Sequence, residues 1–239
     1  MTIPIALGNA ELEARARQSL GSSEQAIYDM VAAAIDAHNL GGGRLIDVGC
    51  GGGALWRTVS ARFASYCGLD AVRYSGFPDN LEFRAVDLDG TVWPVDSACG
   101  DLVVAVETIE HLENPWAFFR QLASITRPGG AVIVTTPNQL SVLSLLTLGT
   151  KRRFAAFQDA HYPAHRTALL PSDLERAART AGLAAESIAF SHSGRVPLTG
   201  WHYPAAMSSA FPRAFSDNLL IVARKPERAR EGLDALPDE

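Results

Sequence analysis

The stretch Leu45-Ile46-Asp47-Val48-Gly49-Cys50-Gly51-Gly52-Gly53 decides the fold of this chain. It is a short apolar strand with an acidic residue near its end, followed by four glycines within five positions. Glycine accepts positive φ and has no Cβ, so such a loop can turn sharply and bring backbone N–H groups close to a ligand. Residues 54–59 have helical character and would direct their free N–H groups at the same place. The run therefore predicts a nucleotide-cofactor loop.

A second strand that ends in a carboxylate follows the loop. Residues 66–70 read Tyr-Cys-Gly-Leu-Asp, and Rossmann-like folds place the acid that binds ribose hydroxyls about 20 residues after the loop. We therefore expect Asp70 to bind a ribose. The pattern Gly49-x-Gly51-x-x-Ala54 also satisfies the relaxed dinucleotide fingerprint. The loop alone thus leaves a nicotinamide cofactor and S-adenosylmethionine both open.

Further motifs along the chain occur together in one enzyme family, whose first motif is an acidic residue, one spacer and Gly-x-Gly-x-Gly. The matching residues are Asp47, Gly49, Gly51 and Gly53 in the loop; Asp87 after an expected strand at 81–86; an expected strand at 101–107; and Arg127-Pro128-Gly129-Gly130 before an apolar strand that ends near Asn138. In these residues, over roughly positions 40 to 225, the chain resembles the class I S-adenosylmethionine-dependent methyltransferases of the type 11/23 kind.

The resemblance implies an α/β fold: a Rossmann-like, seven-stranded, mostly parallel sheet with helices on both faces and an antiparallel last strand. The residues themselves agree, because expected strands alternate with expected helices. We expect helices at about 24–38, 115–125 and 171–182, and the last two strands at about 184–191 and 218–224. Ser22 or Ser23 would cap the first helix, and Pro115 would open the second.

The same resemblance implies S-adenosyl-L-methionine as the cofactor. Asp47 and the glycine loop would position its methionine part, Asp70 its ribose, and Asp87 with its neighbours its adenine. The residues expected to bind the cofactor are Asp47, Gly49, Cys50, Gly51, Gly53, Asp70, Ala71, Asp87, Leu88 and Glu107.

Length and composition indicate one domain over residues 1–239. A chain of 239 residues with 47% hydrophobic and 20% charged residues can bury a full α/β core. The first residues lack a basic segment followed by a long apolar one, and no stretch reaches the roughly 18 apolar residues of a membrane span. We therefore expect a cytoplasmic protein without membrane contact. The cysteines are odd in number and match no metal spacing, which indicates reduced thiols.

Three segments lie outside the minimal frame: the N-terminal helices of residues 1–40 and the insertions 139–167 and 193–216. Loops of this length are usually functional or disordered. Both insertions are expected to leave the sheet at the C-terminal edge of its strands, where open α/β sheets bind ligands. We expect the three segments to form the acceptor pocket and its lid. Residues 140–146 are apolar enough for a lid helix, with a core helix or a dimer contact left open.

The run Glu107-Thr108-Ile109-Glu110-His111 follows the fourth expected strand, where it would lie beside the reacting methyl. With a later histidine it resembles the metal-binding set of the small-RNA 3′-terminal 2′-O-methyltransferases, and the ubiquinone-pathway O-methyltransferases carry a similar run. That resemblance implies Mg²⁺, Mn²⁺ or Zn²⁺ on Glu107, Glu110, His111 and His165. His161 competes for the last position. Two alternatives stay open: catalysis by His111 as a base, with Glu107 facing the methyl and no metal, or a purely structural role.

Charge is a weak guide to the acceptor. The net charge of -5 argues against an extended contact with a nucleic-acid backbone. The only compact basic run, Lys151-Arg152-Arg153, is either a solvated face or a contact for an anionic small molecule at the lid. The cluster Trp201-His202-Tyr203 in the second insertion would suit a ring or sugar acceptor, or serve packing.

These residues predict S-adenosylmethionine-dependent methyl transfer to a hydroxyl of a small molecule, such as a quinone precursor, a sugar or a secondary metabolite. A metal-dependent RNA 2′-O-methyltransferase is the alternative in the same reaction class, and the absence of an obvious RNA-binding module counts against it. A nicotinamide oxidoreductase would leave residues 107–111 and 127–130 unexplained. A non-catalytic binding protein would typically have lost the glycines or the ribose acid. The expected partner is a small-molecule acceptor, with a homodimer left open.

Overall fold

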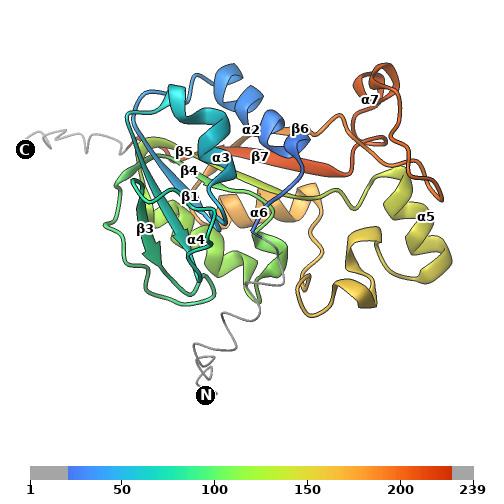
Figure 1. The fold of residues 1–239 in the computed structure, drawn as a ribbon, viewed down its shortest axis with the longest axis horizontal. Helices are drawn as coiled ribbons and strands as arrows, with labels where there is room; N and C mark the ends of the chain where they lie inside the picture. The colour runs from blue at the N-terminus through green and yellow to red at the C-terminus, as the bar shows by residue number, and fades with distance from the viewer. Residues whose placement is uncertain (1–20, 228–239) are drawn as a thin grey trace, which may run out of the picture.

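A seven-stranded sheet forms the centre of the computed structural model, which describes residues 21–227 (Figure 1). Its strands are β1 (Arg44–Val48), β2 (Ser65–Asp70), β3 (Glu82–Ala85), β4 (Gly100–Ala105), β5 (Thr126–Pro137), β6 (Ala184–Phe190) and β7 (Asn218–Arg224). They lie in the order β3-β2-β1-β4-β5-β7-β6. β7 is antiparallel to its neighbours β5 and β6, and the other pairs are parallel. The predicted sheet is therefore confirmed. Of the N-terminal helices expected in residues 1–40, the part in residues 1–20 lies outside the described residues.

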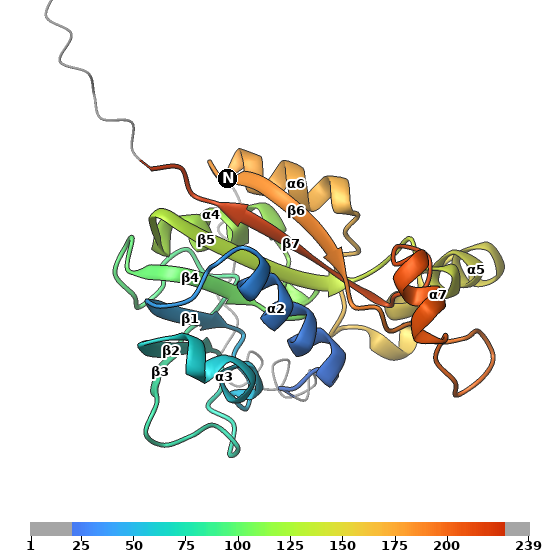
Figure 2. The same ribbon diagram turned by 90° about the horizontal axis from the view of Figure 1, so that it is seen from above.

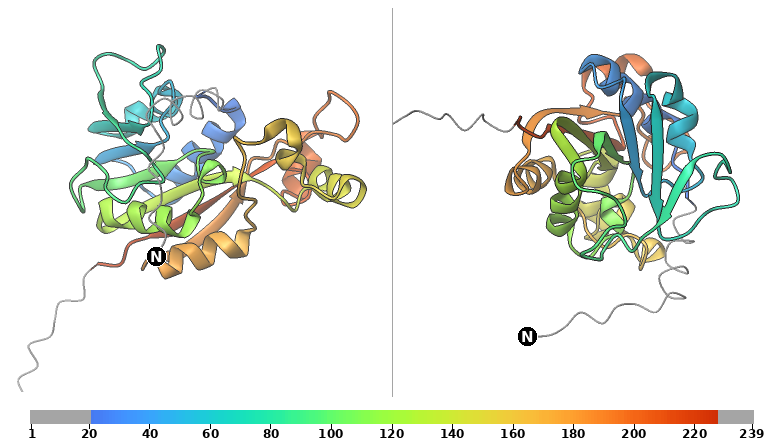
Figure 3. Two further views of the ribbon diagram at one scale, coloured as in Figure 1. Left: turned by 90° about the horizontal axis from the view of Figure 1, so that it is seen from below. Right: turned by 90° about the vertical axis from the view of Figure 1, so that its left-hand side faces the viewer.

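Helices cover both faces of the sheet, as the end-on view in Figure 3 shows. They are α2 (Gln25–Ala37) and α3 (Ala54–Val59) on one face, and α4 (Pro115–Ile125) and α6 (Pro171–Thr180) on the other. Successive strand residues point to opposite faces. Leu45 therefore packs in the hydrophobic cluster of α2 and α3, whereas its neighbour Ile46 packs in the cluster of α4 and α6. Burial on both faces explains why the strand is a continuous apolar run.

The segment before α2 turns toward the glycine loop, and the predicted serine cap is wrong. Glu24 is the N-cap residue of α2, and no side chain caps the helix. The backbone N–H of Ser23 donates to the hydroxyl of Tyr28 at 2.9 Å. The carbonyl of Gly21 accepts a hydrogen bond of 2.9 Å from the backbone N–H of Gly52. The first contact ties the segment to α2 and the second ties it to the glycine loop, and neither serine side chain caps the helix.

The second predicted helix begins and ends as expected. Asn114 is the N-cap residue of α4, and its side-chain oxygen accepts from the backbone N–H of Ala117 at 2.9 Å. Pro115 follows at the first helical position, where its missing N–H costs no hydrogen bond. The predicted helix 115–125 is confirmed.

The fourth strand is shorter than predicted. β4 ends at Ala105, two residues before Glu107. Glu107 has a φ of 47°, in the left-handed region that residues other than glycine rarely adopt. Its backbone N–H donates to the hydroxyl of Thr135 on β5 at 2.9 Å instead of continuing the ladder. A contact with another strand thus ends β4, which a local apolar pattern cannot reveal.

The two insertions lie together at one end of the molecule, beyond the C-terminal ends of the parallel strands (Figure 2). They contain α5 (Val142–Lys151), η3 (Ala155–Phe157), η4 (Asp159–His161) and α7 (Ala205–Ala210). Asn138 joins them, because its side-chain amide donates to the carbonyls of Arg213 and Ser216, both at 2.8 Å. One side chain at the end of β5 therefore fixes where the second insertion returns to the sheet.

α5 presents apolar side chains to solvent. Leu145, Leu146 and Leu148 are 47%, 53% and 37% exposed, respectively, and Ser144 is the one buried residue of this helix. The core-helix alternative for residues 140–146 is therefore wrong. Within residues 21–227, no helix is both long enough and apolar enough to cross a bilayer.

Gly51→Ala will destabilise the fold much more than the adjacent Gly52→Ala. Gly51 has a φ of 49°, and a Cβ there would lie 2.1 Å from the carbonyl oxygen of Gly21, whereas the nearest atom to a Cβ at Gly52 is 3.9 Å away. Left-handed strain alone costs an L-residue roughly 1–2 kcal/mol. We expect G51A to lose at least that much free energy of unfolding and G52A to stay near the wild type. Thermal denaturation checks this, and equal melting temperatures for the two variants would contradict it.

Candidate functional site

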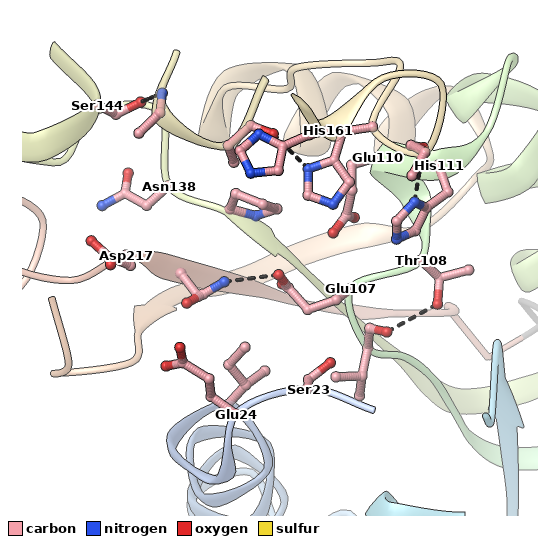
Figure 4. Close-up of a pocket in the computed structure, with 18 of the residues that line it drawn as sticks. Ser23, Glu24, Glu107, Thr108, Glu110, His111, Asn138, Ser144, His161 and Asp217 are labelled. Atoms are coloured by element: carbon pink, nitrogen blue, oxygen red, sulfur yellow. Dashed lines mark hydrogen bonds between the residues drawn. The ribbon is translucent and has the colours of Figure 1, made fainter. Parts of the chain in front are cut away.

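A cavity of about 1410 Å³ lies at the C-terminal ends of the parallel strands, between the sheet and the insertions. Its wall includes Asp70 from the cofactor motif, Glu107 after β4 and Ser144 on α5. Figure 4 shows carboxylate, imidazole and amide groups from separate elements directed toward one space. A pocket for one small ligand usually measures roughly 300–1,000 Å³. The cavity therefore has room for a cofactor and a second molecule.

The glycine loop is anchored on the end of β2. The backbone N–H groups of Gly49 and Cys50 donate to the carbonyl of Leu69 at 2.7 and 3.1 Å. The N–H of Gly51 donates to Oδ2 of Asp70 at 2.9 Å. These bonds bring the predicted ribose acid beside the predicted cofactor loop.

Most residues predicted to bind the cofactor line the cavity. Those that do are Asp47, Gly49, Cys50, Asp70, Ala71, Leu88 and Glu107. Gly51, Gly53 and Asp87 are not part of the wall, and their role in cofactor binding stays a prediction. Gly51 faces the carbonyl of Gly21, Gly53 starts α3 in a left-handed conformation, and the Asp87 carboxylate accepts from the N–H of Asp89 at 3.1 Å.

Asp47 is a buried carboxyl held by a tyrosine. It is 1% exposed, and the hydroxyl of Tyr66 on β2 donates to its Oδ2 at 2.8 Å. Burial raises the pKa of Asp47 to about 7, and the Tyr66 hydrogen bond partly offsets this effect. Burial also raises the pKa of Asp70. The part of the cavity wall next to the glycine loop thus contains two carboxyl groups, Asp47 and Asp70, that lose hydration on folding.

Glu107 lies on the cavity wall, two residues after the end of β4. The hydroxyl of Thr135 donates to its Oε1 at 3.1 Å, and the side-chain amide of Asn218 on β7 donates to its Oε2 at 2.8 Å. Loss of water around the carboxylate raises its pKa, and the charge of Glu110 raises it further. Two donors from different strands therefore fix the orientation of this side chain.

Glu110, His111 and His165 form one group, whose ligand atoms lie within 4.8 Å of one another. His111 Nδ1 lies 2.9 Å from the carbonyl oxygen of Ala164, and His165 Nδ1 lies 2.7 Å from that of Ala156. A carbonyl oxygen only accepts, so each Nδ1 carries the hydrogen. In the neutral ring the other nitrogen then has a lone pair. Burial lowers the pKa of His165 to about 4, so its ring is neutral near pH 7.

Glu110 supplies the carboxylate of this group. Its side chain is 0% exposed, Oε2 accepts from the hydroxyl of Thr136 at 3.3 Å, and Oε1 has no hydrogen-bond partner in the described part of the chain. Burial raises its pKa to about 8. A buried oxygen without a partner is costly, and it suits a site that a cation or a ligand donor completes. The residues present therefore fit a divalent metal.

The structure brings three members of the predicted metal set together and places the fourth apart from them. Glu107 lies outside the group, because Thr135 and Asn218 hold its carboxylate elsewhere. The competition between the two later histidines is resolved in favour of His165. His161 stacks on the ring of His165, with centroids 5.7 Å apart, and is not in the group.

Other predicted and unpredicted residues complete the wall. Lys151 lines the cavity, whereas the expected Trp201-His202-Tyr203 cluster does not, and Trp201 is 80% exposed. Residues that the sequence analysis missed are Ser23, Glu24, Asn138, Asp217 and Asn218. The position of Asn138 directly after an apolar strand was a usable signal. The others come from segments whose place at the cavity depends on tertiary packing.

Comparison with known proteins places the chain in a family. Residues 23–188 match the family described as "Methyltransferase domain". The ubiquinone biosynthesis O-methyltransferase of Chromobacterium violaceum is 30% identical over 189 residues, which cover 69% of this chain and 74% of that protein. The mitochondrial ubiquinone biosynthesis O-methyltransferase of Rattus norvegicus is 28% identical over 179 residues, which cover 69% of this chain and 50% of that protein. This chain thus spans about half the length of the rat relative.

A solved structure agrees in fold. The 1,6-didemethyltoxoflavin-N1-methyltransferase of Burkholderia thailandensis, with bound 1,6-didemethyltoxoflavin and S-adenosylhomocysteine, matches with a TM-score of 0.59 at 16% identity, over 95% of this chain and 94% of that one. The family match spans more than half of the sequence, and it decides between the two cofactors that the glycine loop leaves open. This chain therefore belongs to the methyltransferase-domain family and is an S-adenosylmethionine-dependent methyltransferase.

Proposed function

We propose that this enzyme methylates a hydroxyl group of a small molecule. The observation that carries the proposal is the composition of one cavity wall, which contains the cofactor motif together with Glu107, His111 and His165. The relatives named ubiquinone biosynthesis O-methyltransferase support transfer to oxygen. The size of the cavity supports an acceptor that binds beside the cofactor, in the part of the cavity between Glu107 and α5, which we call the acceptor end.

We infer residue roles from this arrangement. Asp47 and the backbone at Gly49 and Cys50 would hold the methionine part of the cofactor, and Asp70 the ribose. Leu88, rather than Asp87, would contact the adenine, because it belongs to the cavity wall. Glu107, held by its two donors, would face the methyl group.

Methyl transfer asks little of side chains, because the sulfonium already carries an activated methyl group. Placement of the acceptor in line with methyl and sulfur, away from water, supplies much of the rate. A base matters when the acceptor hydroxyl has a high pKa. The Ala164 carbonyl holds the Nδ1 hydrogen of His111, so the other nitrogen can take the hydroxyl proton. The acceptor oxygen then bonds to the methyl carbon, and the carbon–sulfur bond breaks to leave S-adenosylhomocysteine.

A divalent cation on Glu110, His111 and His165 is the alternative to base catalysis by His111, because the one free ring nitrogen cannot both bind a metal and take a proton. When bound there, it would lower the pKa of the acceptor hydroxyl and orient it. The unpartnered Glu110 oxygen and the two carbonyl-oriented imidazoles support this assignment. The RNA 2′-O-methyltransferase alternative would use the same groups, so the acceptor must be tested separately.

The function is tested by binding and turnover together. We expect S-adenosylhomocysteine to bind in calorimetry and labelled S-adenosylmethionine to methylate catechol but not a small RNA 3′ end. His111→Phe should lower kcat by about 100-fold or more, because proton transfer to a positioned base contributes that much, and leave the S-adenosylhomocysteine affinity unchanged. Methylation of the RNA alone, or of amines and not hydroxyls, would contradict the proposal.

Metal binding is measured separately from methyl transfer, by calorimetric titration. We expect metal-stripped protein to give a heat on titration with Mn²⁺ or Zn²⁺, and Glu110→Gln and His165→Ala each to abolish it. His161→Ala is the matched control, since His161 packs on His165 without joining the group. A heat that survives both substitutions, or that H161A abolishes equally, would refute the site.

Asp47→Asn separates stability from cofactor binding. Because burial raises the pKa of the folded Asp47 to about 7, the unfolded chain gives up this proton at lower pH than the folded chain, and the group costs stability as pH rises toward 7. We therefore expect D47N to melt at or above the wild type at pH 8, with a smaller difference at pH 5, and to bind S-adenosylhomocysteine more weakly. Thermal melts at the two pH values check the sign, and a larger D47N advantage at pH 5 would contradict it.

A further inference from the structure

The cavity wall contains more acidic than basic side chains. The carboxylates on it are Glu24, Asp47, Asp70, Glu107, Glu110 and Asp217, and its permanent cations are Lys151 and Arg195. Arg195 is neutralised, because its Nε lies 2.6 Å from Oδ2 of Asp217. Lys151 forms no ion pair with any residue in the range 21–227 that the structure describes. Among residues 21–227, Lys151 is therefore the permanent cation of this wall that is not held in an ion pair.

A neutral side chain holds this ammonium in place. Lys151 Nζ donates to Oε1 of Gln158 at 3.0 Å. The other end of that amide is also committed, because Nε2 of Gln158 donates to the carbonyl of Ala155 at 3.1 Å. The amide orientation is thus set by η3, and it presents its oxygen to the lysine. An ammonium has three donors, so two remain for a ligand.

The other two residues of the basic run, Arg152 and Arg153, make different contacts from Lys151. Arg153 pairs with Asp159, and neither Arg152 nor Arg153 belongs to the cavity wall. Arg152 is the C-cap residue of α5 in a left-handed conformation. Of three consecutive basic residues, only Lys151 is directed to the acceptor end.

Lys151 is an exposed residue of the cavity wall, and the same wall contains apolar groups. They are Leu143, Leu146, Ala155, Ala156, Pro197 and Leu198. The wall thus suits a molecule with an apolar body and one anionic group.

We propose that Lys151, held by Gln158, binds an anionic group of the acceptor, a carboxylate, sulfonate or phosphate carried on an apolar or aromatic body. This inference rests on the proposed function for the identity of the second ligand as a methyl acceptor. It assigns the substrate class as an organic anion whose charge lies at the α5 end of the cavity and whose hydroxyl lies at Glu107 and His111.

A matched pair of fluorescent probes tests the anion site without turnover. Anilinonaphthalenesulfonate and N-phenylnaphthylamine share one ring system and differ in the sulfonate. With the protein saturated with S-adenosylhomocysteine, we expect Lys151→Met to weaken the sulfonate probe about tenfold, the size of one charged hydrogen bond, and to leave the neutral probe unchanged. Lys151→Arg should retain the affinity, and Arg152→Met is the control that changes neither probe.

Salt provides a second measurement on the wild type. Rising ionic strength should weaken the sulfonate probe and not the neutral one, so the proposal stays testable even if a Lys151 variant does not fold. The anion site would be overturned if K151M weakened the binding of both probes equally, or if R152M weakened the sulfonate probe as much as K151M does. It would also be overturned if neither K151M nor salt changed the affinity for the sulfonate probe.

Turnover separates this inference from the proposed function. We expect wild-type enzyme to methylate protocatechuate with a higher kcat/KM than its methyl ester, and K151M to remove that preference. Equal kcat/KM for the two in the wild type would overturn the anionic substrate class. If neither compound is methylated while the sulfonate probe still depends on Lys151, hydroxyl methylation fails and an anion site at Lys151 stands.

Discussion

The contact between Thr108 and Gly49 is the constraint on which the site depends. The Thr108 hydroxyl lies 3.2 Å from the carbonyl oxygen of Val48, so the loop after β4 touches the loop after β1. A Cβ at Gly49 would stand 2.2 Å from that hydroxyl oxygen, and only glycine permits the approach. Glu107 and Glu110 flank Thr108 in sequence. Their carboxylates consequently reach the same cavity as the cofactor loop.

The buried carboxyl groups of this cavity favour the binding of a cationic ligand. Burial raises the pKa of Asp47, Asp70, Glu107 and Glu110, so each carboxylate is less stable in the folded chain than in water. A sulfonium cofactor, and a divalent cation where one binds, would supply the missing positive charge. Such sites lose stability in the free protein in exchange for binding, which is common where function needs buried charge.

The acceptor end is built from parts of the chain that are far apart. α5 and η4 come from the first insertion, and Pro197 and Leu198 come from the second. The shared fold does not set the acceptor, because the toxoflavin-pathway neighbour is named as an N-methyltransferase and the quinone-pathway relatives as O-methyltransferases. In our proposal the insertions contribute to the choice of acceptor, and Lys151 on α5 is the residue that would bind its anionic group.

Local sequence by itself determined the helix at residues 115–125 and the glycine loop after the first strand, because apolar periodicity, caps and glycines act over a few residues. The resemblance of several motifs to one family predicted the seven-stranded sheet. Tertiary structure alone decided the directions of the polar side chains. It directs the Glu107 carboxylate to donors on β5 and β7, and it places His165 rather than His161 beside Glu110 and His111. The physical reason is that a side chain's partners here lie on other strands and insertions, and packing between distant segments sets which of them it meets.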